Sequence, residues 1–294
     1  MQPLLAVRNL TTDYGTYTQV VRAIEAVDLD VYPGELLGVV GVAASGKSTL
    51  VYSILNLVPT PGKIVAGEVQ FRGTDLLHSP EKRLQRIRGA DIGLIVPDPR
   101  RHLNPLMHVG DQIAMVIRTH KKVDKAEALR RASMLIASVG IPDPEWRMRS
   151  YPHELSGGMC QRIAIAMAIA NHPALILADE PTAGLDVTVQ IQILDLLRDA
   201  SQQHGSATLL VTRDLGIVAH YCQRVAVMHA GRIVEIASTR SFFTAASSPY
   251  SQALLRATML AKGETEDGLT TRSEDGSNGH ADRIGSPVMR SEEG

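Results

Sequence analysis

The sequence predicts an α/β fold, in which a mostly parallel sheet is covered by helices and carries a smaller antiparallel layer. An apolar run from Leu36 to Val40 precedes a glycine-rich loop and a helical stretch. A second apolar run, Leu175 to Ala178, ends in two acids, and buried parallel strands have this near-continuous apolar composition. Strand-rich segments near residues 4–7, 24–31 and 68–71 predict the antiparallel layer.

The loop after the first apolar run fits the pattern G-x-x-x-x-G-K-[ST], which is typical of phosphate-binding loops. In such a loop the backbone N–H groups cradle phosphates, Lys47 reaches the β- and γ-phosphates, and the Ser48 hydroxyl is a ligand for Mg²⁺. The pattern alone also occurs by chance, but the preceding strand and the helix expected from about Gly46 to Leu57 favour a nucleotide site. The predicted nucleotide-binding residues are Gly41, Val42, Ala43, Ala44, Ser45, Gly46, Lys47, Ser48 and Thr49.

Asp179 and Glu180 stand at the end of the second apolar run. Acids at the carboxyl ends of parallel strands lie at the ligand edge of such sheets. We expect Asp179 to hold Mg²⁺ together with Ser48, and Glu180 to polarise an attacking water as a general base. The alternative is a helix that begins with an acidic cap, which the other motifs disfavour.

A turn with two adjacent glycines lies between the phosphate loop and the acids, in Leu155-Ser156-Gly157-Gly158-Met159-Cys160-Gln161-Arg162. Glycines have no Cβ, so this turn can approach a ligand closely. The apolar stretch from Ile163 to Ala170 predicts a buried helix, whose N-terminus attracts anions. A Ser-Gly-Gly turn alone often only caps a helix. In this position it resembles the signature motif of the ATP-binding subunits of ABC transporters.

This resemblance implies an ABC-type P-loop ATPase with a RecA-like core, a small antiparallel β layer and an inserted helical subdomain. We expect the ATP-binding domain to span residues 1–262. The helical subdomain would occupy about 100–157, and a C-terminal helical extension about 241–262. Residues 263–294 are rich in Gly, Ser and charge, so we expect a disordered tail there.

In the resembled family two ATP-binding subunits pair head to tail, so that each ATP lies between one phosphate loop and the other subunit's signature motif. Asp186 falls in the loop that faces the partner. Tyr14 falls where an aromatic ring lies against the adenine, with Tyr17 close by as an alternative. The residues that the resemblance assigns to the signature, acting in trans, are Leu155, Ser156, Gly157, Gly158 and Gln161.

Three positions depart from the family pattern. Pro97 occupies the place of a glutamine that contacts Mg²⁺ and water, and proline has no side-chain oxygen or N–H for either role. Arg213 occupies the place of a histidine; an arginine can donate to a γ-phosphate but cannot relay a proton. Ala44 replaces a usual glycine and strains the loop if that position takes a positive φ. The resemblance therefore implies a degenerate site at this chain's own phosphate loop, unless a neighbour compensates.

In a homodimer, both nucleotide sites would lack the glutamine and the histidine. A partner subunit that has both residues would provide one working site, which this chain's signature motif would complete. We therefore expect a heterodimer with a second ATP-binding subunit, and ATP and Mg²⁺ as cofactors. Residues 102–113, 151–159 and 248–255 resemble the peptide and nickel importer group. This adds two integral membrane permease subunits and, indirectly, an extracytoplasmic solute-binding protein as partners. Dipeptides, oligopeptides, nickel chelates and glutathione stay open as solutes.

The composition agrees with this class. A net charge of −1 over 294 residues provides no basic field to attract nucleic acid. Apolar runs are far shorter than the ~20 residues of a membrane span, and the N-terminus has no signal-peptide pattern. Cys160 and Cys222 lie in apolar helical contexts, so we expect reduced core thiols and, with no cysteine after Cys222, no iron–sulfur cluster. We expect a peripheral protein on the cytoplasmic face of the plasma (inner) membrane, held by its permease subunits.

Two other functions share these motifs. A soluble ABC ATPase of DNA repair or translation is disfavoured by the importer-like stretches and by the lack of a coiled-coil, zinc-finger or basic segment. A subunit that clamps ATP without hydrolysing it is favoured by Pro97 and Arg213 and opposed by Glu180. Co-purification with membrane proteins or with nucleic acid tests the first alternative, and single-site turnover tests the second.

Overall fold

The computed structural model describes residues 2–15 and 19–270. The described residues up to Leu255 form one compact unit, and those from Arg256 onward form a second. All of the predicted motifs lie in the first unit, which contains two sheets.

In the described chain the central sheet has six strands, in the order β10-β9-β3-β8-β7-β6. β3 pairs in parallel with β8 and β9, and β7 pairs in parallel with β6 and β8, whereas β10 returns antiparallel to β9. Every residue of β3, β7 and β8 is buried, as expected for parallel strands covered on both faces. The strands are β3 (Leu36–Val40), β6 (Ile92–Ile95), β7 (Leu175–Asp179), β8 (Ala207–Thr212), β9 (Arg224–His229) and β10 (Arg232–Ser238).

The smaller sheet is antiparallel and has the strand order β2-β1-β4-β5. β1 lies between β2 and β4 and pairs with both through register shifts that mark bulges. These strands extend well beyond the three short segments that the sequence predicts, because the bulges let pairing continue past interruptions. The strands are β1 (Leu5–Gly15), β2 (Val20–Val31), β4 (Gly62–Phe71) and β5 (Thr74–Asp75).

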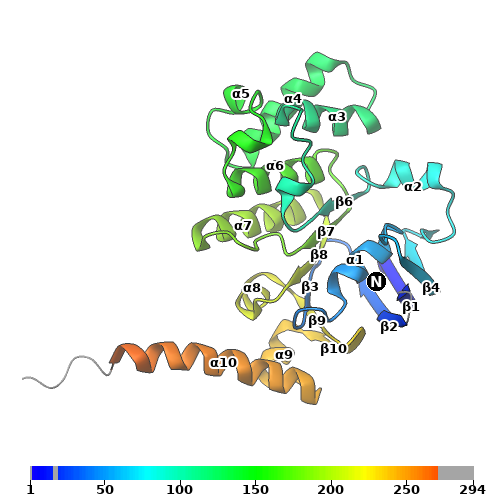
Figure 1. Cartoon of the computed structure of the whole chain (residues 1–294), viewed down its shortest axis with the longest axis vertical. Helices are drawn as coiled ribbons and strands as arrows, with labels where there is room; N and C mark the ends of the chain where they lie inside the picture. Colours follow the sequence, from blue (N-terminus) through cyan, green and yellow to red (C-terminus); the bar gives the residue numbers. More distant parts are fainter. Residues whose placement is uncertain (1, 16–18, 271–294) are drawn as a thin grey trace, which may run out of the picture. The chain divides into compact units, whose positions relative to one another are not determined.

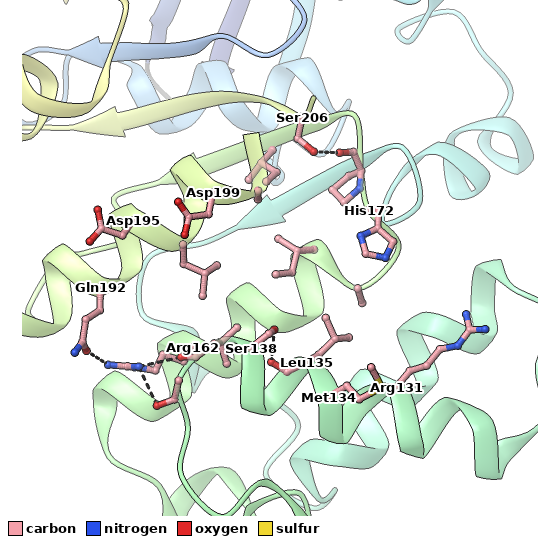
Figure 2. A pocket seen from close by; sticks show the side chains of 18 of the residues that line it. Arg131, Met134, Leu135, Ser138, Arg162, His172, Gln192, Asp195, Asp199 and Ser206 are labelled. Atoms are coloured by element: carbon pink, nitrogen blue, oxygen red, sulfur yellow. Dashed lines mark hydrogen bonds between the residues drawn. The ribbon is translucent and has the colours of Figure 1, made fainter. Parts of the chain in front are cut away.

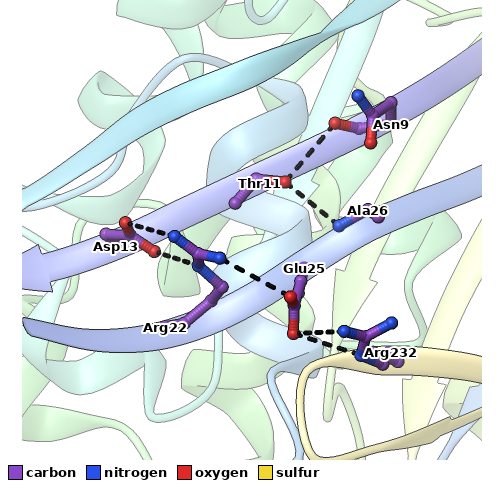
Figure 3. A network of polar contacts seen from close by, with 7 residues as sticks. All are labelled: Asn9, Thr11, Asp13, Arg22, Glu25, Ala26 and Arg232. Atoms are coloured by element: carbon purple, nitrogen blue, oxygen red, sulfur yellow. Dashed lines mark hydrogen bonds and ion pairs between the residues drawn. The ribbon is translucent and has the colours of Figure 1, made fainter.

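A chain of ion pairs joins the smaller sheet to the edge of the central sheet (Figure 3). Arg22 of β2 donates to Asp13 of β1, with Nε 3.0 Å from Oδ1, and lies 3.5 Å from Glu25. Glu25 in turn pairs with Arg232 of β10 at 2.8 Å. Because the two arginines are largely exposed, these ion pairs contribute little to stability.

The central sheet separates two hydrophobic cores. The strand-side core lies against the smaller sheet and α1 (Lys47–Ile54) and includes Leu37, Val39 and Leu50. The helix-side core lies on the opposite face and includes Leu36 and Val40. Successive residues of β3 thus enter different cores, which is the two-residue alternation of a strand.

Helices fill the chain between β6 and β7 and pack together on the helix side (Figure 1). The Asp124 side chain begins α4 by accepting from the Glu127 N–H at 2.8 Å. With the two sheets, this insertion confirms the predicted fold class. The inserted elements are η1 (Pro99–Arg101), α3 (Val109–His120), α4 (Lys125–Ser138), α5 (Pro144–Arg147), η2 (Pro152–Glu154) and α6 (Gly157–Ile169).

The last helix, α10, runs to Thr270 and so continues past Lys262, where the sequence predicts the tail to begin. The rest of that predicted tail, residues 271–294, lies outside the described residues. In the described part of the chain, no helix has both the length and the apolar character that crossing a membrane requires. The other helices are α2 (Glu81–Ile87), α7 (Val187–His204), α8 (Leu215–Tyr221) and α9 (Thr239–Ala245).

Candidate nucleotide site

The glycine-rich loop joins β3 to α1 at the carboxyl end of the central sheet, the edge where ligands bind in such sheets. Two of its glycines allow close backbone packing. A Cβ at Gly41 would lie 2.1 Å from the Met228 carbonyl oxygen, and one at Gly46 would lie 2.6 Å from the Ala23 carbonyl oxygen. Gly46 also takes φ +103, which favours glycine. The loop therefore rests against β2 and β9.

Lys47 is the first residue of α1 and is buried with its ammonium turned into the loop. Its Nζ donates to the carbonyl oxygens of Gly41 and Val42, each at 2.8 Å, and to Ser45 Oγ at 3.2 Å. Burial lowers the pKa of Lys47; the charge of Arg213 acts in the same direction, and the charges of Glu180 and Asp179 oppose it. The loop thus holds a cation at the position where the motif predicts phosphate contacts.

Ala44 takes φ +59, in the left-handed region. The position therefore has the backbone that the usual glycine adopts freely, and the alanine is strained there by about 1 kcal/mol.

Asp179 ends β7 and is 1% exposed, and neither carboxylate oxygen has a hydrogen-bond partner among the described residues. Burial raises the pKa of Asp179; the Ser48 hydroxyl and Lys47 oppose the rise, and the charge of Glu180 adds to it. An unpaired buried carboxylate beside a hydroxyl fits a hard cation, because a bound cation offsets the cost of burying the charge. The described residues contain no cluster of three His, Cys, Asp or Glu side chains for a metal. Mg²⁺ does not need one, since phosphates and water complete its shell.

Glu180 follows with φ +44, a left-handed backbone, and its N–H donates to the Val211 carbonyl oxygen at 3.0 Å. Its carboxylate does not stand free. Arg213 Nη2 lies 2.9 Å from Glu180 Oε2, with the arginine side chain 57% exposed and the glutamate side chain 23% exposed. The predicted general base is therefore bonded to one of the residues that depart from the family pattern.

Pro97 lies just beyond β6, and its neighbour Asp98 takes φ +53. Asp98 is the acid nearest in sequence to the missing glutamine. It is exposed and pairs with Arg101, with Oδ2 2.8 Å from Nε. The Asp98 carboxylate is thus paired with Arg101, and among the described residues it makes no hydrogen bond or ion pair with Asp179 or Ser48.

The Ser-Gly-Gly turn begins α6. Ser156 is exposed and caps the helix, since its Oγ accepts from the Met159 N–H at 3.2 Å. A Cβ at Gly157 would meet no atom within 4 Å, so this surface is open to an approaching group. Leu155 is buried in the helix-side core, where it anchors the turn.

Unlike Ser156, Gln161 is buried. It is 4% exposed, and its Nε2 has no hydrogen-bond partner among the described residues. Gln161 is thus more buried than Ser156 and the two glycines, and its predicted role in trans stays a prediction. Met159 is the partly exposed residue after the two glycines.

Asp186 is exposed and begins α7, where its Oδ1 accepts from the Val189 N–H at 3.0 Å. Tyr14 lies in β1 opposite Gly62, and a Cβ at Gly62 would stand 2.7 Å from its ring. Gly62 therefore lets the ring lie close to β4. Tyr17, the alternative to Tyr14, lies outside the described residues.

Comparison with known proteins decides the family. The model of a family described as ABC transporter matches residues 24–183. A probable peptide ABC transporter ATP-binding protein of Sinorhizobium fredii is 47% identical over 253 residues, which cover 86% of this chain and 76% of that protein. The chain belongs to the ABC transporter family.

Other members of the ABC transporter family are similar along most of their length. An oligopeptide transport ATP-binding protein of Bacillus subtilis is 44% identical over 268 residues, covering 91% of this chain and 75% of that protein. A dimeric ATP-binding cassette in a post-hydrolysis state, bound to ADP and Pi, matches with a TM-score of 0.74 at 26% identity, covering 80% of this chain and 99% of that one. The chain is thus an ATP-binding subunit and an ATP hydrolase of the ABC class, as the signature and phosphate loop predict.

A large cavity of this ABC subunit lies away from the predicted nucleotide site (Figure 2). It measures about 980 Å³ and lies between α4, α6 and α7. Arg162 closes one end by donating to the Val139 carbonyl oxygen at 2.9 Å and to Gln192 of α7. Among the described residues that line it, none belongs to the predicted nucleotide site.

Sequence reasoning did not find the bond between Arg213 and Glu180, because the two residues are 33 positions apart and are brought together only by the pairing of β7 with β8. It also missed Tyr52 of α1. Burial raises the pKa of this phenol, and the charges of Asp179 and Tyr14 act in the same direction. No motif marks Tyr52, so only its position in the fold places it near the site.

Proposed function

We propose that this chain is the ATP-binding subunit of a peptide importer and forms a heterodimer with a second ATP-binding subunit. The names of its relatives support peptides as the solute, since they describe peptide, oligopeptide and dipeptide transport proteins. Residues 102–113, 151–159 and 248–255 support the same group. Two integral membrane permease subunits would hold the chain at the cytoplasmic face of the membrane, and a solute-binding protein would deliver the peptide from outside.

The chain's own phosphate loop is proposed to bind ATP with Mg²⁺. Lys47 exchanges its bonds to loop carbonyl oxygens for bonds to phosphate, which are stronger because both partners are charged. Ser48 and Asp179 would hold Mg²⁺, and the ion would supply charge neutralisation of the phosphates. The unpaired, buried carboxylate of Asp179 supports this assignment.

The same site is proposed to hydrolyse ATP poorly. Glu180 must accept a proton from water to act as general base, yet one of its oxygens is bonded to Arg213. Arg213 cannot accept a proton in its place, and Pro97 has no side-chain oxygen to orient the water. The single observation that carries the proposal is this contrast: the base is tied to an arginine, while the signature turn at Ser156 is open.

A heterodimer would account for both the bond between Glu180 and Arg213 and the open signature turn at Ser156. In a head-to-tail pair, Ser156 and the glycines after it would complete the partner's nucleotide site with open N–H groups at the start of α6. The partner would supply a complete phosphate loop, glutamine, glutamate and histidine. Exposed apolar side chains at Val42, beside the loop, and Val187, at the start of α7, are consistent with a covered surface there.

Two glutamate variants of the assembled transporter test this proposal. Glu180→Gln is expected to change ATP turnover little, because this glutamate already contributes little as a base. The matching Glu→Gln change in the partner is expected to lower turnover by roughly 10²–10⁴-fold. Equal losses from the two variants would mean that this chain's own site works and that the proposed asymmetry is wrong.

A further inference from the structure

Arg100 connects the segment that follows β6 to the signature turn. It lies in η1, and its Nη2 donates to the carbonyl oxygen of Leu155 at 3.1 Å. Leu155 directly precedes Ser156, the residue that caps α6. The guanidinium also lies close enough to Cys160 to oppose the rise in thiol pKa that burial causes. The Arg100 side chain is therefore bonded to the residue that directly precedes the exposed turn.

The segment that carries Arg100 is stiff and anchored. Pro97 and Pro99 flank Asp98, and the fixed φ of each proline restricts the turn. Pro99 is buried, and Leu103 packs in the helix-side core with Leu155 and the first turns of α6. The segment between β6 and Arg100 is therefore conformationally restricted and anchored by buried residues.

The end of β6 lies beside the candidate catalytic edge. β6 pairs in parallel with β7, and Ile95 stands opposite Ala178, the residue before Asp179. The strand that supplies the carboxylates and the strand that leads to Arg100 are therefore direct neighbours. A single hydrogen bond, from Arg100 to the Leu155 carbonyl oxygen, links the segment that follows β6 to the signature turn.

Stability does not explain the contact. A cation near the N-terminus of α6 faces the positive end of the helix dipole, which is unfavourable. The Arg100 side chain is exposed, and a single part-buried hydrogen bond to a carbonyl oxygen contributes little to folding. The contact is better explained by what it positions, the carbonyl group next to Ser156.

We propose that Arg100 is a positioning residue that holds the signature turn in register for ATP turnover in the partner subunit's site. The inference rests on the proposed function, because it assumes that Ser156 works in trans. The partner's own phosphate loop binds the ATP, so a misplaced signature turn slows the reaction without weakening nucleotide binding. The expected effect is thus on kcat and not on KM.

Arg101 provides a matched control. It carries the same charge, is the next residue, and is 83% exposed; its side chain pairs with Asp98 at 2.8 Å, and none of its recorded contacts in the described chain reaches α6. In the assembled transporter, Arg100→Ala is expected to lower kcat for ATP by about tenfold at unchanged KM, since small misplacements cost large factors in rate. Arg101→Ala should match the wild type. Arg100→Lys, which can still donate to the Leu155 carbonyl oxygen, should restore most of the rate.

Melting temperature and one further variant distinguish a folding defect from a failure of the Arg100 inference or of the proposed function. Arg100→Ala is expected to melt within about a degree of the wild type, because this single hydrogen bond contributes so little. Ser156→Arg fills the open turn and should abolish turnover; if it does not, the proposed function itself fails. If Ser156→Arg abolishes turnover but Arg100→Ala equals Arg101→Ala, or raises KM instead of lowering kcat, the inference about Arg100 is overturned.

Discussion

Arg213 Nη2 lies 2.9 Å from Glu180 Oε2, so the residue at the position of the family's histidine is bonded to the predicted general base. The bond occupies one carboxylate oxygen and fixes the direction of the side chain. The degeneracy that we propose for this site therefore rests on two losses, the proton relay of the family's histidine and an unbonded general base. Pro97 adds a third loss, because it cannot orient water.

Restoring the family residues should restore turnover. In a transporter whose partner site is silenced by its own Glu→Gln change, the double variant Pro97→Gln, Arg213→His frees Glu180 and returns the water-orienting oxygen. We expect ATP hydrolysis from this chain's site to rise by roughly 10²-fold. Steady-state phosphate release measures it. Arg213→Lys with Pro97→Gln is the control, since it keeps a cation that pairs with Glu180; a gain as large in this control would rule out the ion pair as the cause.

Removing the loop lysine should weaken nucleotide binding. Lys47→Ala deletes a charge-assisted donor to phosphate, and we expect the Kd for Mg-ATP to rise by about 10–100-fold in titration calorimetry. Lys125→Ala removes an equal charge from α4, where Lys125 lies 3.8 Å from Asp111, and should leave the Kd unchanged. Equal affinity of the Lys47→Ala variant and the wild type would contradict the assignment of the loop.

The strained alanine of the loop gives a stability prediction. Ala44→Gly relieves a left-handed backbone at φ +59, and we expect the melting temperature to rise by about 2–4 °C. Glycine also gains freedom in the unfolded chain, which keeps the gain small. Ala43→Gly, whose φ is not positive, has only this entropic cost and should lower the melting temperature. A fall of similar size in both variants would show that the strain at Ala44 is negligible.

Asp179 should be destabilising at neutral pH when no cation is bound. Its folded pKa is raised, mainly by burial, so its stabilising contribution exists below the unfolded pKa and is lost as pH rises through the folded value. In EDTA at pH 7, Asp179→Asn is therefore expected to melt higher, by about 2–4 °C for each kcal/mol recovered. The difference should shrink toward pH 3, where the wild-type carboxyl is protonated. Scanning calorimetry at the two pH values measures it, and a lower melting temperature at pH 7 would contradict the sign.

The sequence was sufficient for the parts of the site that are local. Lys47 and Ser48 lie within one loop and helix start, and Asp179 lies at the end of one apolar strand, so spacing alone predicts their roles. The sequence could not predict contacts between distant segments, such as those of Arg100 with Leu155 and of Arg213 with Glu180. The burial of Gln161 was out of reach for a related reason: helical phase decides whether it faces inward, and the apolar composition of α6 all round gives no phase.

The division of the subunit into two cores separates its two contributions to ATP chemistry. The phosphate loop is fastened to the strand-side core through Leu50 and Val51 of α1, whereas the signature turn is fastened to the helix-side core through Leu155 and Ile163. The loop that we propose binds this subunit's own nucleotide and the turn that we propose completes its partner's site are therefore anchored in different cores. A local opening of one core would leave the contacts within the other core in place.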